Sequence, residues 1–286
     1  MGEDSTKHTF SHKFVYNKAL DMRYPPKISV ITPSFNQDRY IERTIRSVLE
    51  QRYSNLEYIV VDGGSTDETI EILKRYEGKL RWISERDEGQ SDAINKGIKM
   101  ATGDIIAYLN SDDMYEESAL KKVADFFRDN PSKMWLLGKC RIIDESDREV
   151  RRAITFYKNL WLNRYSYNTL LITNFISQPA VFLRRELVEE IGLFNVAQHR
   201  VMDYEYWLKA GRKYFPGIIN EYLAKFRVHS SSKTSSSFWN TFSEELEVSR
   251  EYSDSRMINA LHYLNYIGIC FVYTLLNTVS RVRRRW

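Results

Sequence analysis

The sequence lacks the features that define several protein classes. It has only two cysteines among 286 residues, Cys140 and Cys270, and both lie inside apolar stretches. This scarcity argues against a disulfide framework or a zinc site and favours a reducing compartment such as the cytoplasm. The first ten residues, MGEDSTKHTF, contain no apolar core of a signal peptide.

Glycine-rich phosphate loops are also missing. No G-x-G-x-x-G follows the first apolar stretch, and no Walker sequence of glycine, lysine and serine or threonine occurs. Dinucleotide-dependent oxidoreductases and P-loop enzymes are therefore disfavoured. A net charge of +4 is too small by itself to indicate a nucleic-acid partner, so none is expected.

After a polar extension over residues 1–24, the first half of the chain alternates apolar stretches with amphipathic segments. Strands are expected at about residues 28–31, 56–62, 80–84, 104–109 and 134–144, separated by helices at about 38–49, 65–76, 91–101 and 116–129. This alternation predicts an α/β fold with a mostly parallel sheet covered on both faces. Asp38 is expected to cap the first helix, and Ser65 with Glu68 to form a capping box at the second.

Two adjacent carboxylates follow the fourth predicted strand, in the sequence Asn110-Ser111-Asp112-Asp113. Open α/β sheets place their ligands at the carboxyl ends of strands. Oxygen ligands there suit Mg²⁺ or Mn²⁺, and these metals usually bind together with substrate phosphates. Taken alone, such a pair more often only caps the next helix.

The second half changes character. Residues 156–178 are rich in aromatic side chains and Asn. Gln178-Pro179 leads into a predicted strand, AVFL, and a helix, RRELVEEIG. A short helix is expected near Asp203, then a strand over YLAKFRVH, a polar loop over SSSKTSSS, and helix from about residue 238.

Seven motifs in this order resemble the family 2 inverting glycosyltransferases of the GT-A fold, a Rossmann-like α/β architecture. They are ITPSFN at 31–36, VDGGSTD at 61–67, DEGQSDAINKG at 87–97, ATGDIIAYLNSDD at 101–113, Gln178-Pro179, MDYEYWL at 202–208 and FRVHSSSKT at 226–234. The resemblance implies a catalytic domain over 25–237, with a nucleotide-binding half at 27–115, an acceptor half at 116–237 and a C-terminal helical extension at 238–286. It also implies transfer of a hexosyl or N-acetylhexosaminyl group from a nucleotide-sugar, usually a UDP-sugar, to an acceptor hydroxyl.

The resemblance assigns a Mn²⁺ or Mg²⁺ site to Asp112 and Asp113, which stand at the family's metal-binding DXD motif. Asn110 replaces the usual first Asp of that motif. Asn110 and Ser111 are expected to contact the donor, for example at a ribose hydroxyl. His229 resembles a C-terminal His that helps bind metal or diphosphate, although a structural role is the default for a lone His.

Further donor contacts are implied around the nucleotide. Asp62 resembles the family's nucleotide-contacting Asp, with a turn cap as the alternative. Many members have a second Asp where Gly63 stands, and Asp92 is the candidate to replace it. The remaining expectations are that Pro33 and Phe35 wall the base pocket unless Phe35 is core, that Arg227 and Lys233 pair with phosphate oxygens, and that Arg86 and Asp87 form a surface salt bridge or touch the donor.

Asp203 matches the second acid of the family's Glu-Asp base motif, and Met202 replaces the first. Inversion by direct displacement needs one carboxylate near the acceptor hydroxyl to take its proton. Asp203 is therefore the expected general base, and Glu205 is the fallback. The alternative is that Asp203 only caps its helix.

Residues 257–280 contain no Asp, Glu, Lys or Arg, and four of the last six residues are Arg. Polar residues gather on one side of this predicted helix and apolar residues on the other. Segment 257–286 is expected to lie on the anionic inner leaflet of a membrane. An apolar face docked on the catalytic domain or on a second subunit is the first alternative, and a true membrane span is the second.

These features predict an enzyme at the cytoplasmic face of the inner membrane that acts on a lipid-linked or growing surface glycan. Assembly into a homo-oligomer is left open. Two other functions stay open. A nucleotidyltransferase acting on sugar phosphates also pairs an α/β sheet with metal-binding carboxylates, but would need a glycine-rich phosphate loop. A non-catalytic nucleotide-sugar-binding relative would be signalled by loss of Asp112 and Asp203, and both are present.

Overall fold

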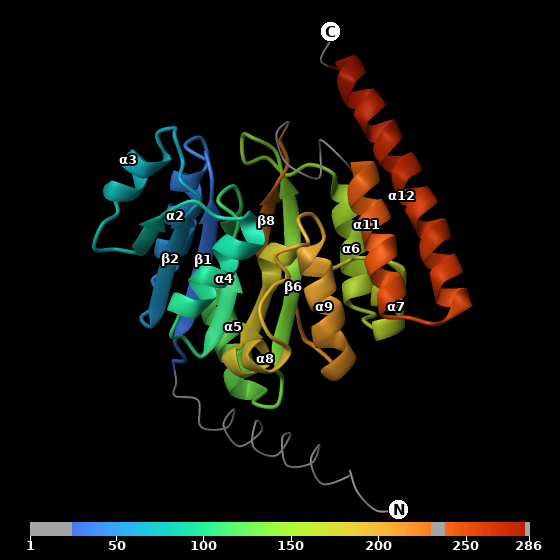
Figure 1. Cartoon of the computed structure of the whole chain (residues 1–286), viewed down its shortest axis with the longest axis horizontal. Helices are drawn as coiled ribbons and strands as arrows, with labels where there is room; N and C mark the ends of the chain where they lie inside the picture. Colours follow the sequence, from blue (N-terminus) through green and yellow to red (C-terminus); the bar gives the residue numbers. More distant parts are fainter. Residues whose placement is uncertain (1–24, 230–237, 284–286) are drawn as a thin grey trace, which may run out of the picture.

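The computed structural model describes residues 25–229 and 238–283, and one eight-stranded sheet forms the centre of the molecule (Figure 1). Lys233 lies outside the described residues. The strands are β1 Ile28–Ser34, β2 Leu56–Asp62, β3 Arg81–Ser84, β4 Ile105–Tyr108, β5 Met114–Tyr115, β6 Trp135–Ile143, β7 Val181–Arg184 and β8 Gly217–Arg227. Their order in the sheet is β3-β2-β1-β4-β7-β6-β8-β5.

Helices lie around this sheet, and the last two stand at one end of the molecule, on the right in Figure 1. They are α2 Ile41–Leu49, α3 Thr69–Lys74, α4 Gln90–Met100, α5 Ala119–Asp129, α6 Arg152–Leu162, α7 Tyr167–Ile172, α8 Arg185–Ile191, α9 Met202–Lys213, α11 Phe238–Glu251 and α12 Arg256–Arg283, with a 3₁₀ turn η1 over Gln178–Ala180.

The predicted α/β fold is confirmed, and the parallel pairing is concentrated in the first half. Strands β3, β2, β1 and β4 are all parallel neighbours, and β6 pairs with β8 in parallel. β7 runs antiparallel between β4 and β6, and β5 runs antiparallel to β8. Every residue of β1 is buried, with Val30 in one apolar cluster and Ile31 in the other. A strand buried on both faces needs this continuous apolar sequence.

Two predicted helix caps are wrong. α2 begins after Tyr40 and has no side-chain cap, so Asp38 does not cap it. α3 begins after Glu68, and Ser65 does not cap it either. The Ser65 hydroxyl instead donates to Asp62 Oδ1 at 2.5 Å and accepts from the backbone N–H of Asn36 at 2.7 Å.

Three elements were not predicted. β5 is only two residues long, and α6 and α7 form within the aromatic stretch that has no clear helical periodicity. β5 packs against α2 and β8, α6 against β6, and α7 against α9 and α12, so tertiary packing decides the conformation of these elements.

We predict that Gly97→Ala lowers the free energy of unfolding by about 1–3 kcal/mol. Gly97 lies where α4 crosses β1, and a Cβ there would lie 2.3 Å from Ile31 Cγ2. Urea unfolding followed by circular dichroism measures the change. Gly268→Ala in α12 is the matched control, because its Cβ would meet nothing within 4 Å, and this change should leave stability equal or higher. Equal effects of the two substitutions would contradict the packing argument.

Candidate active site

A cavity of about 400 Å³ opens at the carboxyl ends of β1, β4 and β8. Eight candidate residues from the sequence line it: Pro33, Phe35, Asp87, Asn110, Ser111, Asp112, Asp203 and His229. Asp62, Asp92, Asp113, Glu205 and Arg227 are not among its lining residues. Phe35 is 57% exposed, so the alternative that it belongs to the core is wrong.

Asp112 and His229 form one wall of the cavity. Asp112 follows β4 and His229 follows β8, and Asp112 Oδ2 lies 2.9 Å from His229 Nε2. The imidazole is tilted against the Tyr40 ring, with 4.8 Å between ring centroids. A carboxylate oxygen and an imidazole nitrogen thus converge at one point of the cavity wall.

This pair fits a divalent cation that takes its other ligands from substrate and water. Within residues 25–229 and 238–283, no group of three or more His, Cys, Asp or Glu side chains could enclose a metal. Mg²⁺ and similar cations usually keep several waters and bind through one or two protein groups plus substrate phosphates. The donor set of Asp112 and His229 is of that open kind.

Asp113 has a different position from Asp112. Its side chain is 0% exposed, and its Oδ1 accepts a hydrogen bond of 2.8 Å from the backbone N–H of Arg227. Burial, together with the Asp112 charge, raises the pKa of Asp113 well above the ordinary Asp value. The sequence predicted a metal ligand here, and the structure shows a buried carboxyl that joins the start of β5 to the end of β8.

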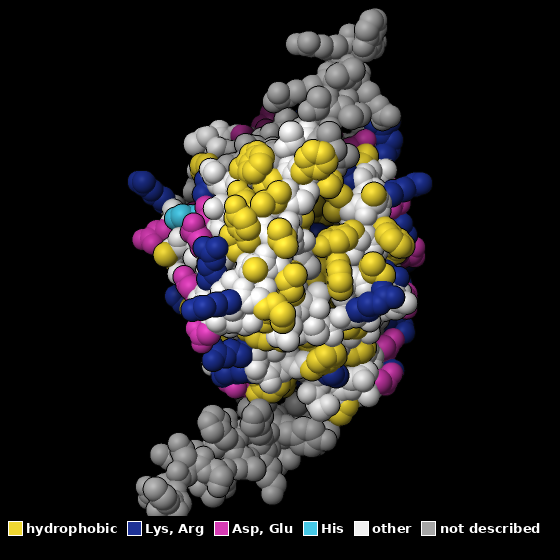
Figure 2. Space-filling model, turned by 90° about the vertical axis from the view of Figure 1, so that its right-hand side faces the viewer, with side chains coloured by type: hydrophobic (Ala, Val, Ile, Leu, Met, Phe, Trp, Pro, Cys, Tyr) yellow, Lys and Arg dark blue, Asp and Glu magenta, His cyan; other side chains and the backbone are white. Residues whose placement is uncertain are grey.

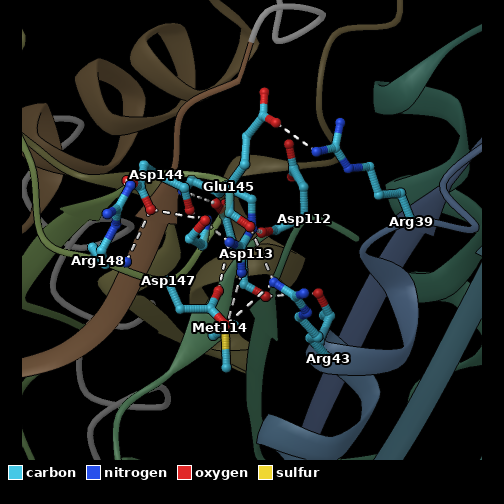
Figure 3. A network of polar contacts seen from close by, with 12 residues as sticks. Arg39, Arg43, Asp112, Asp113, Met114, Asp144, Glu145, Asp147 and Arg148 are labelled. Carbon is cyan, nitrogen blue, oxygen red and sulfur yellow. Dashed lines mark hydrogen bonds and ion pairs between the residues drawn. The ribbon is translucent and has the colours of Figure 1, made fainter.

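Arg227 is likewise engaged inside the protein. Its guanidinium is 0% exposed, donates at 2.8 Å to the carbonyls of Asp112 and Asp144, and pairs with Asp147 at 2.5 Å. Figure 3 shows the loop that carries Asp144 and Asp147, which Arg43 also holds through Asp147. This arrangement does not place Arg227 at a phosphate in the cavity.

Asp62 is fully buried at the end of β2. Its carboxylate accepts from the backbone N–H groups of Gly64 and Ser65 and from the hydroxyls of Ser65 and Ser84, at 2.5–3.0 Å. These four bonds shape the loop after β2, which is the turn-capping role that the sequence left open. Asp92 accepts from the backbone N–H of Glu88 and pairs with Lys96, also away from the cavity.

Asp87 lies in the cavity wall beside Gly63. A Cβ at position 63 would lie 2.5 Å from Asp87 Oδ2, so no side chain fits there while this carboxylate is in place. Asp87 Oδ1 accepts from the backbone N–H of Gly89, which fixes its orientation. The missing acid at position 63 thus coincides with a carboxylate supplied from a different loop.

Two glutamines in the cavity wall had no role in the sequence analysis, although both stand inside the quoted motifs. Gln90 Nε2 donates to Asn110 Oδ1 at 2.6 Å, and Asn110 Nδ2 lies 3.4 Å from Gln178 Oε1. Gln178 Nε2 donates to the Tyr108 carbonyl at 2.7 Å. This chain of amides fixes the Asn110 side chain at the end of β4.

Asp203 lines the cavity from the first turn of α9. The helix begins at Met202 after Val201, so Asp203 is not its N-cap residue. Burial raises the pKa of Asp203 above the ordinary Asp value. Glu205 points elsewhere, because residues two apart on a helix do not share a face, and it pairs with Lys209 at 2.7 Å.

α12 is oriented with its polar side toward the protein. His262 is 2% exposed, and its Nδ1 lies 2.7 Å from the Leu171 carbonyl oxygen. Leu264 and Phe271, on the apolar side, are 63% and 64% exposed, and Figure 2 shows hydrophobic side chains along this face. An apolar face of α12 docked on the catalytic domain is therefore wrong. No helix in the described part of the chain has the length and apolarity to cross a membrane.

The parallel half-sheet, the carboxylate at the end of β4 and the cavity there define a GT-A type transferase site. Residues 29–192 match the family model "Glycosyl transferase family 2". The chain belongs to this family, and it is a glycosyltransferase.

Individual relatives agree with this assignment. The chain is 30% identical over 263 residues to the putative teichuronic acid biosynthesis glycosyltransferase TuaG of Bacillus subtilis, covering 90% of this chain and 98% of TuaG. It is also 30% identical over 236 residues to an uncharacterized glycosyltransferase of Rickettsia conorii, covering 78% of this chain but only 39% of that longer protein.

Two solved structures share the fold at low sequence identity. S. aureus TarS residues 1–349 in complex with UDP-GlcNAc has a TM-score of 0.60 at 21% identity, over 78% of this chain and 66% of that one. The mannosyltransferase PcManGT of Pyrobaculum calidifontis, in complex with GDP-Man and Mn²⁺, has a TM-score of 0.61 at 17% identity, over 99% and 90% of the two chains.

We predict that Asp113→Ala lowers the free energy of unfolding by about 1–3 kcal/mol, because the buried Arg227 N–H loses its acceptor. Asp112→Ala is the matched control, since Asp112 lies at the cavity and is partly exposed. Its loss should cost clearly less stability. Chemical denaturation of both variants measures the difference, and a larger loss for Asp112→Ala would contradict the assigned roles.

Proposed function

We propose that the protein moves a sugar from a nucleotide-sugar, in the first instance a UDP-sugar, to an acceptor hydroxyl with inversion at the anomeric carbon. The observation that carries the proposal is a single cavity that brings together the Asp112–His229 pair and the Asp203 carboxylate. One part of this cavity suits a diphosphate with its cation, and another offers a base to the acceptor.

The nucleotide is proposed to lie between the end of β1 and the loop before α4. Pro33 and the exposed ring of Phe35 supply apolar surface for a base. Asp87 takes the base-reading role first considered for Asp62 and Asp92, since it alone of the three lines the cavity. Asn110 and Ser111 are proposed to face the ribose and diphosphate. A role for Lys233 at the phosphates remains part of the proposal.

Asp112 and His229 are the residues that would hold Mn²⁺ or Mg²⁺, and Asp113 keeps this wall in place from behind. The cation, when bound, would neutralise charge on the departing nucleoside diphosphate. The solved structure of PcManGT is a complex with both GDP-Man and Mn²⁺, which supports this use of the site.

Asp203 is proposed as the general base. Proton transfer to a base is most effective when the pKa of the base is near the working pH, and burial moves the pKa of Asp203 upward. Inversion requires no covalent sugar–enzyme intermediate, so one carboxylate suffices. Glu205 remains only a formal fallback, because it is held by Lys209 outside the cavity.

The acceptor is proposed to be a lipid-linked or growing surface glycan at the cytoplasmic face of the inner membrane. The name of TuaG refers to biosynthesis of a polysaccharide, teichuronic acid. The outward apolar side of α12 provides a surface for the membrane, and this helix contains no Asp or Glu. Arg256 at its start and the Arg residues after position 280 suit anionic lipid headgroups.

The nucleotidyltransferase function and the non-catalytic binding function are both less well supported. Family membership separates the chain from nucleotidyltransferases acting on sugar phosphates. A non-catalytic nucleotide-sugar-binding relative has no need of a base in the cavity, and the Asp203 carboxylate is present there.

We predict that UDP raises the thermal unfolding temperature of the wild-type protein only when Mn²⁺ or Mg²⁺ is present. Asp112→Asn should lose this cation-dependent shift, because the carboxylate is one of two protein ligands. Asp203→Asn should keep the shift and lose at least about 10²-fold in UDP release from a UDP-sugar. Thermal-shift and UDP-release assays with a panel of nucleotide-sugars provide both measurements.

Donor binding and the role of Asp203 as base can be contradicted independently. Binding of no nucleoside diphosphate with either cation would refute the proposed donor site. Undiminished UDP release by Asp203→Asn would remove Asp203 as the base. A shift with GDP and GDP-Man but not with UDP would keep the site and change the nucleotide.

We predict that the full chain floats with vesicles containing phosphatidylglycerol and that Leu264→Glu/Phe271→Glu abolishes flotation. Both side chains lie on the outward side of α12, so carboxylates there oppose burial in lipid. Phe215→Glu is the matched control, because Phe215 is 60% exposed before β8, and this variant should float normally. A wild-type protein that stays off vesicles and forms a dimer broken by the double variant would show that a second copy covers this face.

A further inference from the structure

We propose that Tyr40 and Thr44, at the start of α2, are positioning residues that hold the proposed cation ligands His229 and Asp112 at one point of the cavity wall. The proposal rests on the assignment of Asp112 and His229 to a divalent cation. Neither Tyr40 nor Thr44 belongs to the seven family motifs or lines the cavity, so each acts through a residue that does.

Tyr40 and Thr44 form a buried polar side at the start of α2. Tyr40 directly precedes the helix and Thr44 is four residues later, a spacing that makes two side chains neighbours on a helix surface. Their side chains are buried, with 4% and 1% of their surface exposed. The apolar residues Ile41, Ile45 and Val48 belong to an apolar cluster of the core, and Tyr40 belongs to neither cluster. This polar side of α2 therefore has contacts of its own.

The Tyr40 ring contacts two side chains at the end of β8. Its centroid lies 4.8 Å from that of the His229 imidazole, and the central carbon of the buried Arg227 guanidinium lies 5.1 Å from the Tyr40 centroid. The face of an aromatic ring attracts a guanidinium, so Arg227 stabilises the position of the ring. The Tyr40 hydroxyl has no hydrogen-bond partner among the described residues. The ring, and not the hydroxyl, thus limits rotation of the imidazole.

The Thr44 hydroxyl holds the chain on both sides of Asp112. Thr44 Oγ1 lies 2.9 Å from the carbonyl oxygen of Ser111 and 2.7 Å from that of Asp113, and it donates to this pair of carbonyls. Ser111 and Asp113 are the residues directly before and after Asp112. The hydroxyl therefore fixes the backbone from which the Asp112 side chain extends into the cavity.

The two contacts together set the spacing of the candidate ligands. Asp112 and His229 are 117 positions apart in the sequence, yet Asp112 Oδ2 and His229 Nε2 lie 2.9 Å apart. A rotated imidazole or a shifted backbone at Asp112 would no longer offer both atoms to one cation. Contacts that orient metal ligands typically change metal affinity about 10–100-fold when they are removed. The start of α2 supplies one such contact for each ligand.

The first test measures the Mn²⁺ concentration at which UDP gives half of its maximal thermal shift in the full chain. Tyr40→Leu should raise this midpoint about tenfold, and Tyr40→Phe, which keeps the ring, should leave it unchanged. Phe127→Leu is the matched control, because Phe127 is also buried and its ring lies 4.9 Å from the guanidinium carbon of the buried Arg184. This control should lose stability and keep the wild-type midpoint.

The second test addresses the Thr44 hydroxyl. Thr44→Val keeps the shape of the side chain and removes the donor, so it should raise the Mn²⁺ midpoint about tenfold, and Thr44→Ser should restore it. Ser47→Ala is the matched control on the same helix, because Ser47 Oγ accepts from the backbone N–H of Tyr115 and does not contact the carbonyls beside Asp112. Ser47→Ala should keep the wild-type midpoint. If Tyr40→Leu does not fold, Thr44→Val decides the proposal.

A third measurement asks whether Tyr40 acts through His229. In the His229→Gln background, Tyr40→Leu should change the Mn²⁺ midpoint by less than about twofold, because the imidazole that Tyr40 orients is absent. An undiminished tenfold effect in that background would contradict the proposed route.

The outcomes separate this proposal from the cation site itself. If the wild-type protein shows no Mn²⁺-dependent shift with either UDP or GDP, the cation site fails and the positioning role fails with it. If Asp112→Asn removes the shift but Tyr40→Leu and Thr44→Val keep the wild-type midpoint, only the positioning role is refuted. Equal increases in Phe127→Leu or Ser47→Ala would also refute it, since a general loss of stability would then explain the effect. An increase in Tyr40→Phe would refute the role of the ring.

Discussion

The hydrogen bond from the Arg227 N–H to the buried Asp113 carboxyl is the contact on which the site depends. It joins the residue just before β5 to the last residue of β8, 114 positions later in the sequence. Asp112 lies one residue before Asp113 and His229 two residues after Arg227, and their side chains meet in the cavity wall with 2.9 Å between Asp112 Oδ2 and His229 Nε2. Burial of an acid in this way is unfavourable unless it is hydrogen-bonded, and here the bond also sets the spacing of two candidate metal ligands.

Arg227 extends that tie to the loop after β6. Because its guanidinium is held by the carbonyls of Asp112 and Asp144 and by Asp147, the loop is fixed against the ends of both strands. The basic residue of the FRVH motif therefore braces these segments and is not among the residues that line the cavity. A residue can belong to a family motif without lining the cavity, and only the three-dimensional contacts show which motif residues do so.

The sequence was sufficient for the α/β fold because its strands are continuous apolar stretches and its motifs follow them in order. It also located the cavity, since Asp112, Asp203 and His229 all line it. It did not reveal which carboxylates form hydrogen bonds inside the protein instead of facing the cavity. Asp62 bonds to the loop after β2, and the path of that loop depends on Gly64 in a left-handed conformation, φ +85°. Likewise, Asp87 beside Gly63 is a contact between two loops that no local pattern encodes.

The C-terminal helices show that the sequence pattern also does not predict which side of a helix faces the protein. The amphipathic pattern of α12 separated its two sides correctly but did not say which side meets the protein. The polar side does so, because a backbone carbonyl at Leu171 offers His262 a partner that an apolar side could not use. α11 also carries Glu245 inward, where its Oε1 accepts a hydrogen bond of 2.8 Å from Asn174 Nδ2. This helix pair therefore presents an apolar side to the outside and polar contacts to the protein, an orientation that the amphipathic pattern alone does not determine.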